Sequence, residues 1–146
     1  MISIDRVDHL VLTVADVDRA ADFYEQVLGM RPVSFPDDRR AVAFGSQSIK
    51  LHPASDLVEP TATHPVPGSA NLCFITGSAL SEVQEHLRSN DVRIEEGPVS
   101  RTGARGPITS LYLRDPDGNL IEVARYDEDP VPAPDAAAHA QFTETG

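Results

Sequence analysis

The sequence contains one cysteine, no tryptophan and few basic residues, with 12 Lys and Arg against 23 Asp and Glu. A single cysteine excludes an intrachain disulfide and a cysteine-rich zinc site. The formal charge of −11 argues against nucleic acid or an anionic membrane as a partner. The chain shows neither the pattern of a secretory signal nor an apolar run of membrane-spanning length, so we expect a cytoplasmic protein.

The order of the secondary-structure signals repeats once along the chain. In each round a strand precedes a helix, and three strands follow the helix. The first round is expected at residues 7–14, 16–29, 30–35, 40–45 and 48–52. The second round is expected at residues 71–76, 78–90, 93–97, 108–114 and 119–125. This order predicts two βαβββ modules within one α+β domain.

Local signals delimit these modules. Asp16 and Ser78 are suitable N-caps for the two helices, and Gly29 and Asn90 are suitable terminators. We expect a domain over residues 1–126, with modules at about 6–53 and 70–126 and a proline-rich linker at 54–69. Residues 127–146 are rich in Pro, Ala and acidic side chains, and we expect a mostly disordered tail there.

Each module would cover one face of its sheet with its helix and leave the other face open. Two such modules side by side can form a concave mixed sheet that holds a ligand. Strand alternation places His9 and Val11 on that wall, with Asn71 and Cys73 at matching positions of the second module. Because its neighbours in residues 72–75 are apolar, Cys73 is nevertheless predicted to be a small buried residue rather than a nucleophile.

Two polar residues lie within apolar strands far apart in the sequence. Glu122 follows the turn Asp115-Pro116-Asp117-Gly118-Asn119 and lies between Ile121 and Val123. His9 lies in the apolar stretch that opens the first module. A carboxylate among apolar neighbours is costly unless it is paired or binds a metal ion. The two placements together favour a metal site.

Three segments resemble the vicinal oxygen chelate superfamily, which includes glyoxalase I, fosfomycin-resistance thiol transferases, extradiol dioxygenases and bleomycin-binding proteins. They are Val7-Asp8-His9-Leu10, Val27-Leu28-Gly29-Met30 and Asp115-Pro116-Asp117-Gly118-Asn119-Leu120-Ile121-Glu122. Longer stretches, among them 40–45, 64–69 and 94–108, resemble glyoxalase domain-containing protein 5 and its bacterial relatives. The resemblance covers about residues 7–126 and implies the paired βαβββ fold.

The resemblance also implies metal ligands on the first and fourth strands of each module, here His9 and Glu122. The two other positions depart from the glyoxalase I pattern, because Asn71 replaces a histidine and Lys50 replaces a carboxylate. His52 lies on the same strand face as Lys50 and can supply the missing nitrogen. The expected set is His9, His52 and Glu122 around a divalent ion (Fe, Mn, Ni, Co or Zn), with Asn71 as the alternative third ligand.

Other residues are candidates for contact with substrate. Ser110 and Tyr112 resemble a serine and a tyrosine of the fosfomycin-resistance enzymes that contact substrate, and a Tyr packed in the core is the alternative. Segment 101–106 holds two arginines and two glycines, and we expect a mobile lid whose Arg101 binds an anionic group. A solvated connection is the alternative. We assign catalytic roles to Glu122 and Tyr112, and substrate contacts to Ser110, Arg101, Asn71 and Lys50.

Three function classes remain open. The first is a metal-dependent lyase, isomerase or transferase whose ion chelates two oxygens of a small-molecule substrate. The second is a non-haem Fe(II) dioxygenase. The third is a metal-free protein that sequesters a ligand, of the bleomycin-resistance type. His9 together with Glu122 disfavours the third class, whereas Asn71 and Lys50 weaken strict glyoxalase I activity, so we expect a metalloenzyme of the first class. Superfamily members of this size usually pair, and the strand edges of the modules need covering, so we also expect a homodimer.

Overall fold

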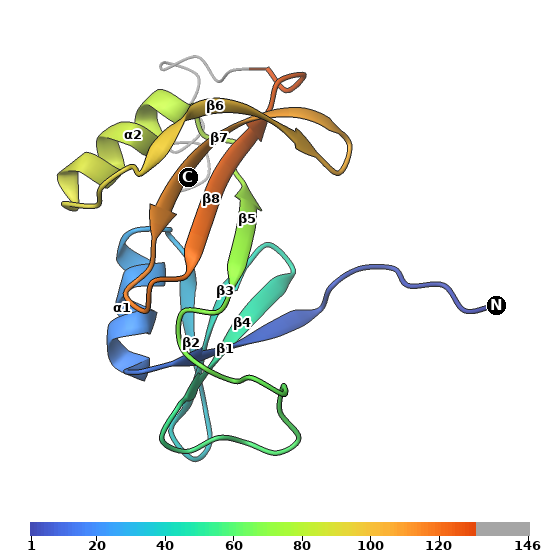
Figure 1. Cartoon of the computed structure of the whole chain (residues 1–146), viewed down its shortest axis with the longest axis vertical. Coiled ribbons are helices and arrows are strands. Elements are labelled where there is room, and N and C mark those ends of the chain that lie inside the picture. Colours follow the sequence, from blue (N-terminus) through green and yellow to red (C-terminus); the bar gives the residue numbers. More distant parts are fainter. Residues whose placement is uncertain (131–146) are drawn as a thin grey trace, which may run out of the picture. The chain divides into compact units, whose positions relative to one another are not determined.

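The computed structural model describes residues 1–130 and contains two helices and eight strands in that range (Figure 1). The first module consists of β1 (His9–Val14), α1 (Val17–Gln26), β2 (Arg31–Phe35), β3 (Arg39–Phe44) and β4 (Gln47–Pro53). The second consists of β5 (Asn71–Ile75), α2 (Leu80–Ser89), β6 (Glu96–Gly103), β7 (Gly106–Arg114) and β8 (Leu120–Tyr126). The predicted repeat and the α+β class are confirmed.

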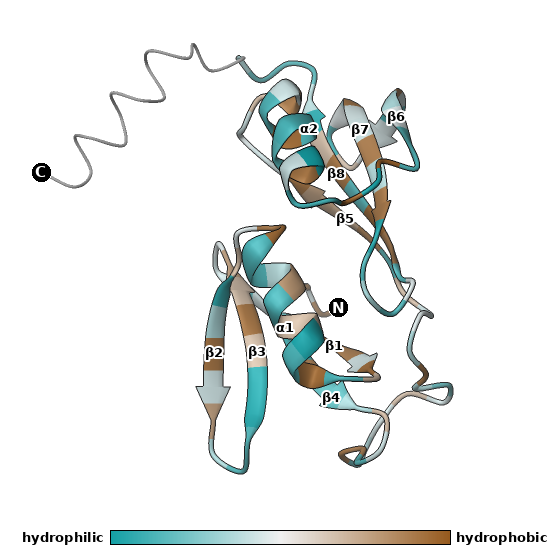
Figure 2. Ribbon diagram, turned by 90° about the vertical axis from the view of Figure 1, so that its left-hand side faces the viewer, coloured by the Kyte–Doolittle hydropathy of each residue, from teal (hydrophilic) through white to brown (hydrophobic). Residues whose placement is uncertain are grey.

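The strand order is the same in both modules: β1-β4-β3-β2 in one sheet and β5-β8-β7-β6 in the other. In the first sheet β1 pairs with β4 in parallel, whereas β3 is antiparallel to both of its neighbours. Figures 1 and 2 show each helix beside the sheet of its own module. Contacts divide the described residues into two units, one of residues 1–71 with 114–120, and one of residues 72–113 with 121–130. We call them unit one and unit two.

Helix α1 begins and ends where the sequence predicts. The Asp16 carboxylate accepts a hydrogen bond from the Arg19 N–H at 3.0 Å, which caps the helix. Gly29 has a φ of 69°, and its N–H donates to the Glu25 carbonyl, as expected of a left-handed terminator. The buried face of α1 includes Tyr24, which becomes part of a polar network described below.

Helix α2 differs from the prediction at both ends. Its N-cap residue is Ala79, and no side chain caps it, so Ser78 is not the cap. Asn90 is the C-cap residue with a φ of −100°, and the left-handed conformation falls on the next residue, Asp91, at 57°. The Asn90 side chain instead donates a hydrogen bond to the His86 carbonyl at 2.9 Å.

The segment predicted as a lid, residues 101–106, forms a β-hairpin, and its role as a mobile lid stays a prediction. Strand β6 runs to Gly103, β7 starts at Gly106, and these two glycines pair with each other. Gly106 has a φ of 140°, which glycine tolerates and other residues avoid. The hairpin therefore closes through two residues, and Arg101 lies inside a strand.

Most of the predicted tail, residues 131–146, lies outside the described residues. Residues 127–130, the described part of the predicted tail, form hydrogen bonds with unit two. The Asp127 N–H donates to the Pro107 carbonyl at 3.0 Å, and Arg125 donates to the carbonyls of Asp129 and Pro130. Neither helix within residues 1–130 has the length and apolar character needed to span a bilayer.

Candidate ligand site

The first part of the candidate site is the open face of the unit-one sheet. The parallel register sets Val11 opposite Lys50 and Thr13 opposite His52, and all four side chains share a face with His9. Val11 is 43% exposed, although it is a large apolar residue in the middle of β1. Walls that contact small ligands combine apolar side chains with a few polar groups.

A cavity of about 430 Å³ opens on this face beside the turn between β2 and β3. Asp37 and Asp38 of that turn have φ values of 66° and 59°, which Asp tolerates better than most residues. The turn places Phe35, the last residue of β2, and Arg39, the first of β3, at the cavity. The lining consists of His9, Val11, Phe35, Pro36, Asp37, Arg39, Arg40, Lys50, His52 and Val58. We call this space the unit-one cavity.

The charge of the unit-one cavity is mostly positive. Arg39, Arg40 and Lys50 face it together with one carboxylate, that of Asp37. Desolvation lowers the pKa of His52, and the charges of Arg39 and Lys50 lower it further. The imidazole of His52 is therefore favoured in its neutral form, which can either accept or donate a hydrogen bond.

His9 has a carboxylate partner. Its Nδ1 lies 2.8 Å from Asp8 Oδ2, and this hydrogen bond is the largest cause of the lowered pKa of the Asp8 carboxyl. With Nδ1–H donating to a carboxylate, Nε2 carries a lone pair. Metal-binding histidines commonly have such an arrangement, because the carboxylate sets both the tautomer and the ring orientation.

His52 and His9 lie too far apart along the strand direction to bind one metal ion readily. His9 pairs with Ser48 and His52 pairs with Thr13, so the two histidines are separated by four residues along parallel strands. At about 3.3 Å per residue, that separation is about 13 Å along the strand direction. Donor nitrogens of one ion lie only about 2.0–2.1 Å from it. The register argues against a joint His9–His52 site, and the ligand role of His52 stays a prediction.

The second part of the candidate site is in unit two, around Glu122. The buried Ser110 hydroxyl donates a hydrogen bond to Glu122 Oε2 at 2.5 Å, across neighbouring strands β7 and β8. Cys73 on β5 lies on the other side of Glu122 and is exposed, so the prediction of a buried Cys73 is wrong. Partial desolvation, then the charge and hydrogen bond of Glu122, raise the pKa of the Cys73 thiol to about 11. Glu122 thus has neutral hydrogen-bonding neighbours.

Arg101 and Tyr112 form a second pair in unit two. Arg101 Nε donates to the Tyr112 hydroxyl at 3.0 Å, and the guanidinium lies 5.4 Å from the centre of the ring. Arg101 also donates to the Ser100 carbonyl at 2.9 Å and to Glu96 Oε1 at 3.4 Å. Because the Tyr112 oxygen accepts from Arg101, its own O–H remains to donate to another group. Tyr112 is half-buried rather than packed in the core.

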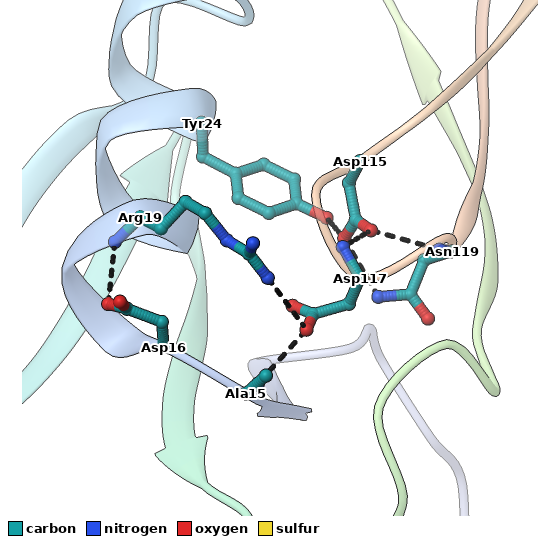
Figure 3. A network of polar contacts seen from close by, with 7 residues as sticks. All are labelled: Ala15, Asp16, Arg19, Tyr24, Asp115, Asp117 and Asn119. Atoms are coloured by element: carbon teal, nitrogen blue, oxygen red, sulfur yellow. Dashed lines mark hydrogen bonds and ion pairs between the residues drawn. The ribbon is translucent and has the colours of Figure 1, made fainter.

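The signature turn before β8 has a structural role within unit one (Figure 3). Asp115 Oδ1 accepts hydrogen bonds from the N–H groups of Asp117 and Asn119, each at 2.9 Å. Asp115 Oδ2 accepts from the Tyr24 hydroxyl at 2.6 Å and from Asn119 Nδ2 at 2.7 Å. Asp117 Oδ1 accepts from the Ala15 N–H at 3.0 Å, next to the start of α1. These carboxylates connect the turn to the first module.

The predicted metal set includes residues of both units, with His9 and His52 in unit one and Glu122 in unit two. Within neither unit, over residues 1–130, do three or more His, Cys, Asp or Glu side chains gather as a metal site requires. Asn71 is exposed at the start of β5, and its role as a ligand or substrate contact stays a prediction. The ligand set is accordingly treated below as a proposal.

Sequence reasoning missed two features of the site. One is that Arg39 and Phe35 line the unit-one cavity, and the dibasic pair Arg39-Arg40 in an acidic chain was the available signal. The other is the contact between Cys73 and Glu122. The alternation of strand residues contained that second signal, since it placed Cys73 on the open wall.

Two βαβββ units with polar and titratable side chains on their open sheet faces define a class of proteins that bind or transform small molecules. The family model of the Glyoxalase/Bleomycin resistance protein/Dioxygenase superfamily matches residues 6–123, and the chain belongs to that superfamily. The virulence protein STM3117 of Salmonella typhimurium is 52% identical over 123 residues, which cover 84% of this chain and 85% of that protein.

Two further relatives support this membership. The glyoxalase domain-containing protein RDO1 of Mycosarcoma maydis is 47% identical over 127 residues, covering 87% of this chain and 72% of that protein. The solved structure of an integron cassette protein from the mobile metagenome of V. cholerae matches with a TM-score of 0.85 and 54% identity. That match covers 87% of this chain and 99% of the other.

Proposed function

We propose that this protein is a divalent-metal-dependent enzyme that acts on a small, oxygen-chelating substrate, with His9 and Glu122 as metal ligands. The supporting observation is that each of these residues has a hydrogen-bonding partner that orients it. His9 Nδ1 pairs with Asp8, and Glu122 Oε2 accepts from Ser110. Outer partners of this kind hold metal ligands in position and tune their basicity.

The donor types fit a first-row divalent ion. An imidazole nitrogen and a carboxylate oxygen suit Fe, Mn, Ni, Co or Zn. A bound ion would act as a Lewis acid toward oxygen atoms of the substrate. Lys50, at the position where the resemblance implies a carboxylate, cannot be a ligand while protonated and would instead contact substrate.

Tyr112 is the second catalytic candidate. Its hydroxyl oxygen accepts a hydrogen bond from Arg101 Nε, so its proton is directed to a different acceptor. Tyr112 would hold or deliver a proton at the reacting group, and Ser110 would keep Glu122 in its orientation. A lyase, isomerase or transferase reaction is compatible with these roles.

Two other functions remain as alternatives. A metal-free ligand-binding protein is favoured by one observation, the cation Lys50 on the wall where a metal ligand would otherwise lie. A non-haem Fe(II) dioxygenase would need His52 as the second imidazole, and the spacing of His9 and His52 along the strands is unfavourable for that set.

Metal content of the purified protein, before and after anaerobic reconstitution with Fe(II), Mn(II), Ni(II) or Zn(II), tests the proposal. We expect about one ion per chain, with loss of binding in His9→Ala and Glu122→Ala. His64→Ala, an exposed loop histidine, and Glu82→Ala, an exposed residue of α2, are matched controls and should retain the ion. Loss of the ion in His52→Ala would instead support His9, His52 and Glu122 as the ligands, the set expected of a non-haem Fe(II) dioxygenase. A wild-type chain that takes up no ion would leave the ligand-binding alternative.

We also propose that the protein is a homodimer. Within the part of the chain that the structure describes, each four-stranded sheet has two outer strands that pair on one side only, and β2 is mostly exposed along its length. Exposed edges of this kind are commonly covered by another strand or chain. Light scattering at micromolar concentration should give twice the mass of the chain, and a monomer mass would reject the dimer.

A further inference from the structure

We propose that the unit-one cavity binds an anionic group, a phosphate or a carboxylate, through Lys50 and Arg39. The chain as a whole has a formal charge of −11, so diffuse attraction cannot bring an anion to it. Among residues 1–130 of that acidic protein, three permanent cations and a single carboxylate line this cavity. Such a local reversal of charge selects for negatively charged ligands.

The three cations of this cavity differ in whether a carboxylate of the protein already pairs with them. Arg40 Nη1 pairs with the exposed Asp18 carboxylate, so its charge is largely compensated. Within residues 1–130, Arg39 and Lys50 form no ion pair within salt-bridge distance, although the charge of Lys50 acts on the exposed Asp8. A guanidinium and an ammonium together match the oxygens of a phosphate or carboxylate, one as a planar fork and one as a point charge.

The remaining lining indicates what the anion is attached to. Phe35 and Val11 are 45% and 43% exposed, so both side chains are accessible to a ligand. They offer an apolar surface at the same cavity as the cations. The fitting ligand is therefore a small molecule with one anionic end and an apolar or aromatic body. Neutral His52 can add a hydrogen bond to either part.

This inference rests on the proposed function only for identifying the bound anion as part of the substrate. Anion binding by Lys50 and Arg39 needs no metal ion, so the two proposals can fail separately. A chain that binds anions but takes up no metal would reject the proposed enzyme and keep the inference. A chain that takes up metal but shows no Lys50-dependent anion binding would keep the proposed enzyme and reject the inference.

The full chain is first treated with chelator to remove metal ions. It is then titrated separately with phenyl phosphate and with benzoate at low ionic strength, and NMR chemical shifts measure the binding. We expect saturable binding that Lys50→Gln and Arg39→Gln each weaken about tenfold, as for loss of a unit charge near an anion. Arg31→Gln removes one positive charge from exposed β2 of the same unit, outside the cavity, and should change affinity less than twofold. Lys50→Arg should keep most of the affinity and shows that the site tolerates substitution.

The two ligands separate the possible sources of the anionic group. Tighter binding of phenyl phosphate identifies a phosphate or phosphonate, and tighter binding of benzoate identifies a carboxylate. Either result supports an anion site. The inference is overturned if neither ligand saturates, or if Arg31→Gln weakens binding as much as Lys50→Gln does, because the effect would then be one of overall charge.

Discussion

The hydroxyl of Tyr24 donates a 2.6 Å hydrogen bond to the carboxylate of Asp115, across 91 positions of sequence, and both residues are buried. Tyr24 belongs to the first helix, and Asp115 begins the turn that precedes the last strand. Residues 114–120 are accordingly part of unit one, although the repeat in the sequence assigns them to the second module. A segment of the second repeat thus completes the packing of the first.

Tyr24→Phe should destabilise the protein by about 1.5–3 kcal/mol, the usual contribution of a hydrogen bond to a charged group. Asn119 would remain as a partner of the same carboxylate oxygen, so the network would persist in part. Urea denaturation measures the change. Tyr126→Phe is the matched control, because its hydroxyl accepts one hydrogen bond from the Arg105 N–H, and it should cost less. Equal midpoints for Tyr24→Phe and wild type would contradict a structural role for this bond.

The contribution of Tyr24 should also disappear at alkaline pH. Burial raises the pKa of Tyr24 above its ordinary value of 10.0, and the hydrogen bond and charge of Asp115 raise it further. The folded state therefore retains a proton that the unfolded state loses above about pH 10. The stabilisation is complete below that pH and declines by about 1.4 kcal/mol per pH unit above it.

Comparison of wild type with Tyr24→Phe isolates the pH-dependent stabilisation by Tyr24, because the other two tyrosines are common to both proteins. The difference in the free energy of unfolding should be constant from pH 7 to 9 and shrink above pH 10. A difference that stays constant to pH 11 would show that Tyr24 ionises equally in both states.

Gly97→Ala should destabilise unit two by about 2 kcal/mol or more, through strain and close contact. Gly97 has a φ of 118°, and a Cβ there would lie 2.4 Å from the Ser110 carbonyl oxygen. Pairing of β6 with β7 is irregular between Glu96 and Val99, at the position of this close approach. Gly77→Ala, where a Cβ meets nothing within 4 Å, is the control and should change stability little. Similar thermal midpoints for the two variants would refute this account of the close approach at Gly97.

Alkylation of Cys73 should report on Glu122, because the chain has no other thiol. With a pKa of about 11, Cys73 should react slowly with iodoacetamide at pH 8, and the rate should rise about tenfold per pH unit up to that value. In the chelator-treated Glu122→Gln variant, the midpoint of the pH profile of Cys73 alkylation should fall, since the charge of Glu122 raises the pKa of the thiol. It should stay above the ordinary 9.0, because desolvation is the larger cause.

Mass spectrometry of the modified chain measures the rates. Glu95→Gln removes a carboxylate from the same unit without acting on the Cys73 thiol, and serves as the control for net charge. Identical pH profiles for Glu122→Gln and wild type would mean that the Cys73–Glu122 contact does not form in solution.

Local patterns in the sequence were sufficient to predict much of the fold. Asp16 and Gly29 delimit α1 by short-range hydrogen bonding and by a backbone torsion, both of which depend on neighbouring residues only. Alternation of apolar residues located most strands to within a few residues. The hairpin at residues 101–106 was missed because its polar residues also suit a loop, and only pairing with β7 makes it a strand.

The sequence alone determined the superfamily, the two βαβββ modules and the identity of the candidate residues His9, Lys50 and Glu122, because those depend on local periodicity and on motifs. Only the tertiary structure decided which side chains meet: Ser110 with Glu122, Arg101 with Tyr112, and Tyr24 with Asp115. Strand register and helix packing set those contacts over distances in sequence at which no local preference acts. The cationic character of the unit-one cavity arises in the same way, since its charges come from separate strands that the parallel and antiparallel pairing of one sheet brings together.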